Sequence, residues 1–594
     1  MLVASLGSLR KKKAQRVVDR ADEPVAATTP ASSEWALAVL ALVFLCGIFS
    51  TEVADTDFWW HLKTGERVVT EGSLPLPDIY SFTTDLGDES YPGEERVRRF
   101  NLTHEWLAQA AWFMVYSIGG LGGVVAWKGL LLTFVLAVAG YLAWRRSGSL
   151  LAGIVCGLMG VPIMTLFAAD RPTIVTFVMV AAYLLLLEAF ERNGERRVLW
   201  AIPLLQLVWA NAHGGFFMGW VVLGAYCAAA LRWPDSKRNP LWTTAIIAFL
   251  VSALNPNGLR IFEVLLGYRE SYLTKTLIEW TSPPLLGPPY SFPLLLFGSA
   301  AVIALSWRRA KWQDALLLLA FGGAAITAFR NLALVAFVAP ILIATYGWPL
   351  LSPRLQAVER VWGQVALGAL LVGLLGYNAS AGRLFQFRVA DWKAPAGAAE
   401  FLANVDPTVR MFNSYEYGGY LIWKLGPERQ TFVDGRALNE AVYRDYQAIL
   451  STSNRTQRES LLSQYGVQLI VTNSFEFVTG RVYPIVTQLA DPAETSWELV
   501  YQDAQALVYA RSTPANQTLI DQHRLDRAQV LEQMQTACRV YIEHDPELCN
   551  CARTLGFTFG QMGRQAEALE FFDLYLANTP FPDPEAERAA ATLR

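Results

Sequence analysis

Charged residues are scarce in this sequence. Asp, Glu, Lys and Arg make up 17% of the 594 residues, whereas a soluble protein has about 25%. The net charge of −3 excludes a nucleic-acid binder with a broad basic face. Six cysteines are too few for a disulfide scaffold of this length. Because 53% of the residues are hydrophobic, we expect much of the chain to lie in a membrane.

The apolar residues are concentrated between residue 33 and about residue 378. A helix that crosses a bilayer needs about 20 mostly apolar residues. On that criterion the sequence predicts a polytopic α-helical membrane protein with about eleven spans, several of them short. The predicted spans are 35–51, 121–143, 149–167, 173–190, 198–211, 215–232, 241–254, 290–306, 312–328, 331–348 and 361–379. The basic Arg10-Lys11-Lys12-Lys13 lies well before the first apolar run, which favours a retained first span over a signal peptide.

Loop charges predict the orientation. Arg and Lys gather in alternate loops, which the positive-inside rule places in the cytoplasm together with the N-terminus. The other loops and the C-terminal region then lie outside. We expect a multi-pass protein of a bacterial inner membrane. Its predicted parts are a basic cytoplasmic segment (1–34), a membrane domain (35–380), an extracytoplasmic α/β domain (390–515) and a helical region (520–594).

The first outer loop (52–120) carries the densest polar motif. It opens with Asp55-Thr56-Asp57-Phe58-Trp59-Trp60-His61, and we expect a helix from Asp57 to Glu71 that ends at Gly72. Asp57 and His61 are then four residues apart on one helix face, close enough to interact. The loop closes with His104-Glu105-Trp106, where an amphipathic helix on the membrane surface is predicted over 106–118.

These motifs resemble the polytopic glycosyltransferases of the GT-C class, over about the first 380 residues and by topology more than by identity. The offsets of the protein mannosyltransferase and aminoarabinose transferase branch fall on Asp57, His61, Gly65 and Gly72. Asp57-Phe58-Trp59 is similar to the Asp-Pro-Trp turn of the oligosaccharyltransferase branch. The chain departs from the pattern where Phe58 replaces an acid and His61 an aromatic residue. It also resembles uncharacterised bacterial membrane proteins with Asp-x-Asp-x-Trp-Trp-His and His-Glu-Trp motifs.

The resemblance implies an inverting transfer of a sugar from a polyprenyl-phosphate donor to a glycan, lipid or protein acceptor at the membrane surface. Asp57 would be the general base that removes the acceptor proton. Asp55 would support it or bind a divalent metal such as Mg or Mn, although the sequence leaves the cofactor unknown. The alternative is that both aspartates only cap a helix.

Further candidates lie in other outer loops. Arg171 and Arg330 suit contacts with the donor phosphate, as does His213 in a glycine-rich hairpin. The alternatives are a surface ion pair for Arg171, an interface anchor for Arg330 and a polar turn for His213. Acceptor or loop roles are predicted for His61, His104, Glu105 and Glu279. The types of side chain in His61, His104, Glu105 and Asp57 suit a metal, but hydrogen-bonded histidines are the favoured interpretation.

The C-terminal half alternates short apolar runs with helical stretches, which predicts an α/β domain. The expected strands are VRMFN, QTFVDG, VQLIVTN, WELVYQ and ALVYAR. Residues 415–420 and Asp434-Gly435-Arg436 each follow a strand, so acceptor binding or docking on the membrane part is predicted, against a turn with a structural ion pair. The spacing of Leu555-Gly556, Phe559, Ala568 and Phe572 matches a tetratricopeptide repeat, a candidate site for a protein partner. Cys538, Cys549 and Cys551 allow one disulfide with a spare thiol, and the pairing stays open.

Three other functions remain alternatives. A non-catalytic membrane scaffold would recruit partners through the C-terminal part. A surface-polysaccharide polymerase or ligase would also use a lipid-linked donor, but would rely on a later outer loop such as that of Glu279. A transporter is disfavoured because ionisable side chains gather on the outer face rather than at mid-membrane.

Overall fold

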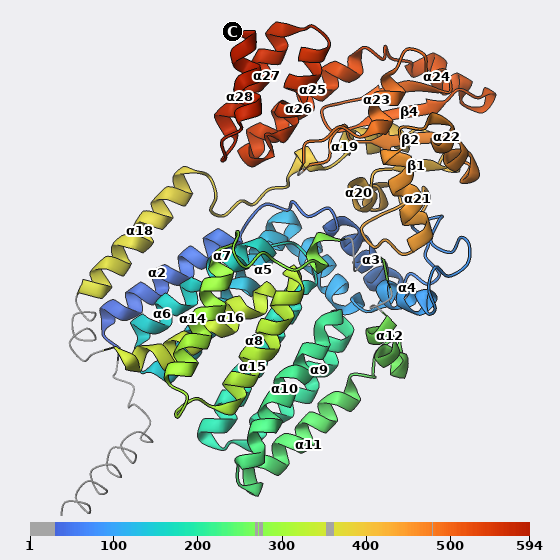
Figure 1. The fold of residues 1–594 in the computed structure, drawn as a ribbon. Coiled ribbons are helices and arrows are strands. Elements are labelled where there is room, and N and C mark those ends of the chain that lie inside the picture. Colours follow the sequence, from blue (N-terminus) through green and yellow to red (C-terminus); the bar gives the residue numbers. More distant parts are fainter. Residues whose placement is uncertain (1–29, 268–270, 273–276, 352–361, 478) are drawn as a thin grey trace, which may run out of the picture.

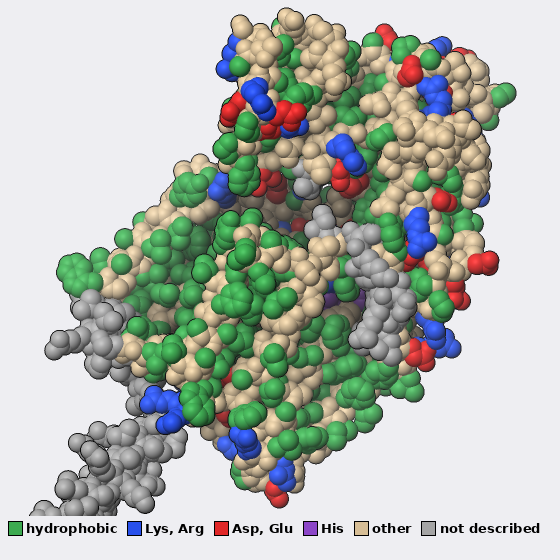
Figure 2. Space-filling model, viewed as in Figure 1, with side chains coloured by type: hydrophobic (Ala, Val, Ile, Leu, Met, Phe, Trp, Pro, Cys, Tyr) green, Lys and Arg blue, Asp and Glu red, His purple; other side chains and the backbone are tan. Residues whose placement is uncertain are grey.

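The computed structural model describes residues 30–594 except 268–270, 273–276, 352–361 and 478. It consists of a bundle of apolar helices, above which sit an α/β domain and a small helical unit (Figure 1). Hydrophobic side chains cover most of the visible surface of the bundle, and charged side chains gather at its ends and on the C-terminal half (Figure 2). This distribution is the one that a bilayer requires of a protein that spans it.

Each predicted span contains helix. The helices of the bundle are α2 (Ser32–Phe49), α5 (Trp106–Ser147), α6 (Leu150–Met159), α7 (Val161–Met164), α8 (Thr173–Asn193), α9 (Ala201–Ala212), α10 (Phe217–Ala229), α11 (Asp235–Val251), α14 (Ser291–Leu305), α15 (Trp312–Thr327), α16 (Leu332–Leu342) and α18 (Gln364–Ser380). Among the residues that the structure describes, six helical segments are long and apolar enough to cross a membrane. The chain is therefore a polytopic membrane protein, and the count of eleven spans stays a prediction.

The first outer loop folds into two helices, α3 (Phe58–Glu71) and α4 (Glu94–Thr103), before α5 begins. Gly72 ends α3 in the left-handed conformation at φ 66°, as expected, because glycine adopts this conformation without steric cost. Gly120, at φ 57° and ψ −155°, interrupts α5. Residues 106–119 therefore form a separate helical segment, in agreement with the predicted amphipathic helix over 106–118, whose position on a membrane surface stays a prediction.

The α/β domain holds a four-stranded sheet in the order β1-β2-β4-β3. The strands are β1 (Met411–Asn413), β2 (Leu469–Thr472), β3 (Trp497–Gln502) and β4 (Leu507–Arg511). β1 and β2 run parallel, and the other two pairs are antiparallel. The helices are α19 (Ala396–Ala403), α20 (Tyr415–Leu425), α21 (Glu440–Ser451), α22 (Arg455–Gln464), α23 (Pro484–Ala490) and α24 (Gln517–His523).

The prediction of a strand in QTFVDG was wrong. Thr431 instead forms an isolated parallel bridge with Ser81 of the first outer loop. The segment fails to join the sheet because its polar groups bond to that loop: Phe82 N donates to Thr431 O at 3.2 Å, and Thr431 N donates to Tyr80 O at 2.9 Å. The bridge thus joins the α/β domain to a segment about 350 residues earlier in the chain.

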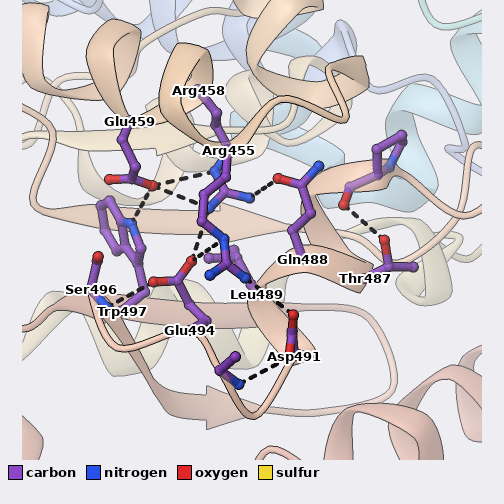
Figure 3. Close-up of polar contacts among 12 residues, drawn as sticks. Arg455, Arg458, Glu459, Thr487, Gln488, Leu489, Asp491, Glu494, Ser496 and Trp497 are labelled. Atoms are coloured by element: carbon purple, nitrogen blue, oxygen red, sulfur yellow. Dashed lines mark hydrogen bonds and ion pairs between the residues drawn. The ribbon is translucent and has the colours of Figure 1, made fainter.

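A buried charge network fixes α22 against α23 and β3 (Figure 3). Arg458 is fully buried, and its guanidinium contacts Glu494 at 3.1 Å and Glu459 at 3.2 Å. The Trp497 indole donates to Glu459 at 2.9 Å. A buried guanidinium is tolerated only when its donors are paired, so this network belongs to the domain core.

The C-terminal helices are α25 (Gln529–His544), α26 (Asn550–Gln561), α27 (Gln565–Asn578) and α28 (Pro584–Leu593). Gly556 packs against Phe572, because a Cβ added there would lie 2.7 Å from the ring. This contact is compatible with a tetratricopeptide-like pair, but the repeat itself stays a prediction. Cys538 and Cys551 form the disulfide, and Cys549 is free and buried.

Candidate functional site

Two aspartates share one arginine at the exit from α2. Arg171 lies in the turn before α8, and its guanidinium contacts Asp55 at 2.9 Å and Asp57 at 3.0 Å. Asp55 also accepts a hydrogen bond from the Asp57 backbone N–H at 3.0 Å. The Asp57 side chain caps no backbone group of α3. Helix capping therefore does not account for the Asp57 carboxylate.

Burial distinguishes the two carboxylates. Burial is the largest influence on Asp57 and raises its pKa to about 6, although Arg171 acts in the opposite direction. Burial is also the largest influence on Asp55 and opposes its ionisation, but the Arg171 charge together with the hydrogen bonds from Arg171 and from the Asp57 backbone N–H lowers the pKa of Asp55. Two neighbouring acids with pKa values displaced in opposite directions are a common arrangement for a base and its supporting group.

A buried ion pair that we did not predict supports Arg171. Lys128, in the second half of α5, is fully buried and contacts Asp170 at 3.0 Å. Its ammonium also donates to the Glu52 carbonyl at 3.3 Å. Lys128 thereby ties the residue before Arg171 to the segment that leads into Asp55. A single lysine inside the predicted span 121–143 was the available sequence signal, because a charge in a membrane segment needs a partner.

Asp57 and His61 have different side-chain partners. Arg171 binds Asp57, whereas His61 lies beside α5, with Nδ1 3.1 Å from Gln109 Nε2 and 3.6 Å from Glu105 Oε2. An interaction between the two side chains stays a prediction. Burial lowers the pKa of His61 to about 4, so its imidazole is neutral.

Glu105 is the centre of a histidine cluster. Its Oε1 lies 3.2 Å from His104 Nε2 and 3.6 Å from His213 Nε2. His213 is buried, and its Nδ1 accepts a hydrogen bond from the Gly215 N–H at 3.0 Å. The structure therefore brings His61, His104, Glu105 and His213 together, as hydrogen-bonded histidines rather than as exposed phosphate ligands.

Arg330 and Glu279 pair with each other. Their side chains lie 3.4 Å apart, and the Arg330 guanidinium stacks on the Trp280 ring at 4.5 Å. The exposed fraction of the Arg330 side chain is 32%, close to the 37% of Arg171. Both arginines can therefore still reach an anion.

The α/β domain covers the aspartates. A Cβ at Gly435 would lie 1.7 Å from Asp57 Oδ1, and one at Gly419 would lie 2.3 Å from the Thr56 carbonyl. Both positions require glycine because no side chain fits between the two segments. Arg436 locks the contact through Asp434 at 2.7 Å and Asp78 at 2.9 Å. The motifs at 415–420 and 434–436 therefore pack against the first outer loop, and the second of them also forms a structural ion pair.

A hollow separates the bundle from the α/β domain in the view of Figure 2, and charged side chains are visible inside it. No group of three or more His, Cys, Asp and Glu side chains in the described part of the chain is arranged to hold a metal ion. The Arg171 guanidinium already bridges Asp55 and Asp57, where a divalent ion would bind. The described residues therefore do not fit a resident metal.

Solved structures share this fold. The oligosaccharyltransferase AglB of Archaeoglobus fulgidus, in complex with an inhibitory peptide and a dolichol-phosphate, matches with a TM-score of 0.52 at 12% identity, over 81% of this chain and 74% of that one. The same enzyme with Zn and sulfate matches with a TM-score of 0.52 at 12% identity, over 93% and 86%. ArnT of Cupriavidus metallidurans, bound to undecaprenyl phosphate, is a looser match: its TM-score is 0.43 at 15% identity, over 82% and 99%. No protein-family model and no curated protein matches the sequence.

Proposed function

We propose that this protein is an inverting glycosyltransferase that moves a sugar from a polyprenyl-phosphate donor to an acceptor at the membrane surface. One observation carries the proposal: a buried carboxylate with a raised pKa, Asp57, lies where the first helix leaves the bundle, in contact with the partly exposed Arg171. The fold shared with AglB, whose structure was solved with dolichol-phosphate, supports it.

In the proposed reaction Asp57 accepts the proton of the acceptor group as that group attacks the anomeric carbon. The bond between the anomeric carbon and the phosphate oxygen breaks, and its electron pair leaves with the lipid phosphate. Direct displacement inverts the configuration at that carbon. Arg171 and Arg330 would stabilise the charge that develops on the leaving phosphate.

Arg171 would have a second task. Its contacts with Asp55 and Asp57 hold the base in place and supply the positive charge that a metal would otherwise supply. Asp55 would keep Arg171 ionised and oriented, so it is assigned a supporting role. Glu105 and its histidines would form the wall behind α3.

The test replaces Asp57 with Asn in the full chain, reconstituted with an undecaprenyl-phosphate sugar and the membrane extract of the source cells as acceptor. We expect transfer to fall by about 10²–10⁴-fold while the melting temperature stays close to that of the unsubstituted chain. Exposed Glu400→Gln is the matched control. Retained turnover by Asp57→Asn would exclude Asp57 as the base. If deletion of 521–594 removes function and Asp57→Asn does not, the scaffold alternative is favoured instead.

A further inference from the structure

Exposed aromatic side chains gather where the chain leaves α18 and turns toward the α/β domain. Tyr377 lies in the last turn of α18, and Phe385 and Phe387 lie in the segment that follows it; all three are at least 42% exposed. The two phenyl rings are stacked, with their centres 6.3 Å apart. Large apolar side chains that stay exposed together mark a contact with a partner or with a membrane.

The position of α18 favours the membrane. The helix packs against α2 through Leu367 and Leu371, whereas Val365, Leu370 and Val372 on its other faces are each at least 55% exposed. An apolar helix with these exposed faces is surrounded by lipid. Its C-terminal end is the end nearest the α/β domain (Figure 1). Aromatic rings at such an end lie at the level of the lipid headgroups.

The backbone fixes Phe385 in place. Its φ of 53° is one that a residue with a side chain rarely adopts. The Phe385 N–H donates to the Gly47 carbonyl at 3.1 Å, and a Cβ added at Gly47 would lie 3.0 Å from the Phe385 ring. The next N–H, of Gln386, donates to the Ser50 carbonyl at 2.7 Å. A strained backbone persists only where its surroundings determine it, so this segment is a built feature of the fold.

Arg383 supplies a charge without a protein partner. No described carboxylate lies within ion-pair distance of it, and its guanidinium lies 5.8 Å from the centre of the Tyr377 ring. Arg388, five residues later, instead binds Glu52 at 2.8 Å. A guanidinium matches the oxygens of a phosphate. A phosphatidylcholine headgroup would bring its own cation near Arg383, so an anionic headgroup is favoured.

We propose that Tyr377, Arg383, Phe385 and Phe387 form a docking surface for a phospholipid with an anionic headgroup, such as phosphatidylglycerol. Arg383 binds the headgroup phosphate, and the aromatic rings contact the glycerol and the first part of the acyl chains. The lipid lies in the leaflet next to the α/β domain.

The docking surface borders the segment that leads to the candidate site. Val53 N donates to the Arg388 carbonyl at 3.0 Å, and Ala390 N donates to the Val53 carbonyl at 2.9 Å. Val53 is two residues before Asp55. A lipid bound at Arg383 therefore restrains the backbone that carries Asp55. The lipid proposal itself does not depend on glycosyl transfer.

The experiment measures hydrogen–deuterium exchange of the full chain by mass spectrometry, in nanodiscs of phosphatidylcholine with and without phosphatidylglycerol. We expect the amides of 381–390 to exchange about fivefold more slowly with phosphatidylglycerol. Arg383→Gln should abolish this slowing and Phe387→Ser should weaken it, whereas Arg383→Lys should keep most of it. Arg524→Gln, an exposed arginine of the α/β domain, is the matched control and should keep all of it. Unchanged exchange of α21 shows that each variant is folded.

Three results would overturn the proposal. Phosphatidylglycerol has no effect on 381–390 in the unsubstituted chain, or Arg383→Gln keeps the full effect, or inorganic phosphate added to phosphatidylcholine nanodiscs produces the same slowing. The last result would show a site for free phosphate rather than for a lipid. None of these results bears on sugar transfer, so the proposed function is tested separately by Asp57→Asn.

Discussion

Two arginines that each bind two carboxylates, one at each end of the helix bundle, have opposite surroundings. Arg146, at the end of α5 far from the α/β domain, contacts Glu188 at 2.7 Å and Asp314 at 3.0 Å. Asp314 also accepts a hydrogen bond from the Tyr346 hydroxyl at 2.6 Å. The Arg146 side chain is 7% exposed, whereas the Arg171 side chain is 37% exposed. The first network is closed around its charges, and the second leaves one side open.

This difference in exposure suggests a structural role for the Arg146 network and a ligand-binding role for the Arg171 network. A closed network of charges holds three helices together and offers nothing to a ligand. An open network keeps a charged face that a substrate can reach, and its carboxylate retains a raised pKa. The following predictions test whether the two networks behave in these two ways.

The largest effects should come from removing each arginine. Arg146→Met removes the cation that lies between two buried acids, so we expect a loss of about 3–5 kcal/mol of stability. Arg171→Met should lower transfer by about 10²–10³-fold, because a charge aimed at the transition state is lost, with a smaller change in melting temperature. Thermal unfolding and transfer assays on both variants check this. The comparison fails if the two variants lose stability and activity in the same proportion.

Removing Lys128 should affect both stability and transfer, each to an intermediate extent. Lys128→Met strands Asp170, so we expect both a lower melting temperature and weaker transfer, because Arg171 follows Asp170 in the chain. The double variant Lys128→Met/Asp170→Leu should recover the melting temperature without recovering full transfer. Complete recovery of both would show that the pair has no part in positioning Arg171.

The pH dependence should report Asp57. A base works only when ionised, so transfer should rise as pH increases through about 6 and level off above about 7. In Arg171→Met the midpoint should move to higher pH, because Arg171 lowers the pKa of Asp57. The rate is measured from pH 4.5 to 8.5. If the midpoint of the pH profile is unchanged in this variant, the profile does not report the ionisation of Asp57.

The smallest effect should be that of chelation. Because Arg171 occupies the position between Asp55 and Asp57, EDTA should change the transfer rate by less than about twofold. Arg171→Met opens that position, so added Mg²⁺ or Mn²⁺ could act there. A large loss of activity of the unsubstituted chain in EDTA would overturn the assignment of the charge to Arg171.

The sequence was most informative where periodicity and composition decide the structure. The helix from Asp57 to Gly72, the apolar helices and four of the five strands followed from local patterns. Partners distant in the chain did not: Arg171 was assigned to a phosphate, yet it binds Asp55 and Asp57 from 116 residues away. Lys128 escaped notice because only the folded chain shows that Asp170 is its partner. QTFVDG has the pattern of a strand, but the backbone of Thr431 bonds to the first outer loop and the backbone of Phe432 bonds to the Asn413 side chain.

The contact of Gly435 with Asp57 has a consequence for biogenesis. The residue that closes over the candidate base is made long after the base itself, so the bundle inserts with an incomplete site. The candidate site is complete only once the C-terminal domain has folded and packed against the first outer loop. We therefore expect chains truncated before Gly435 to show no transfer.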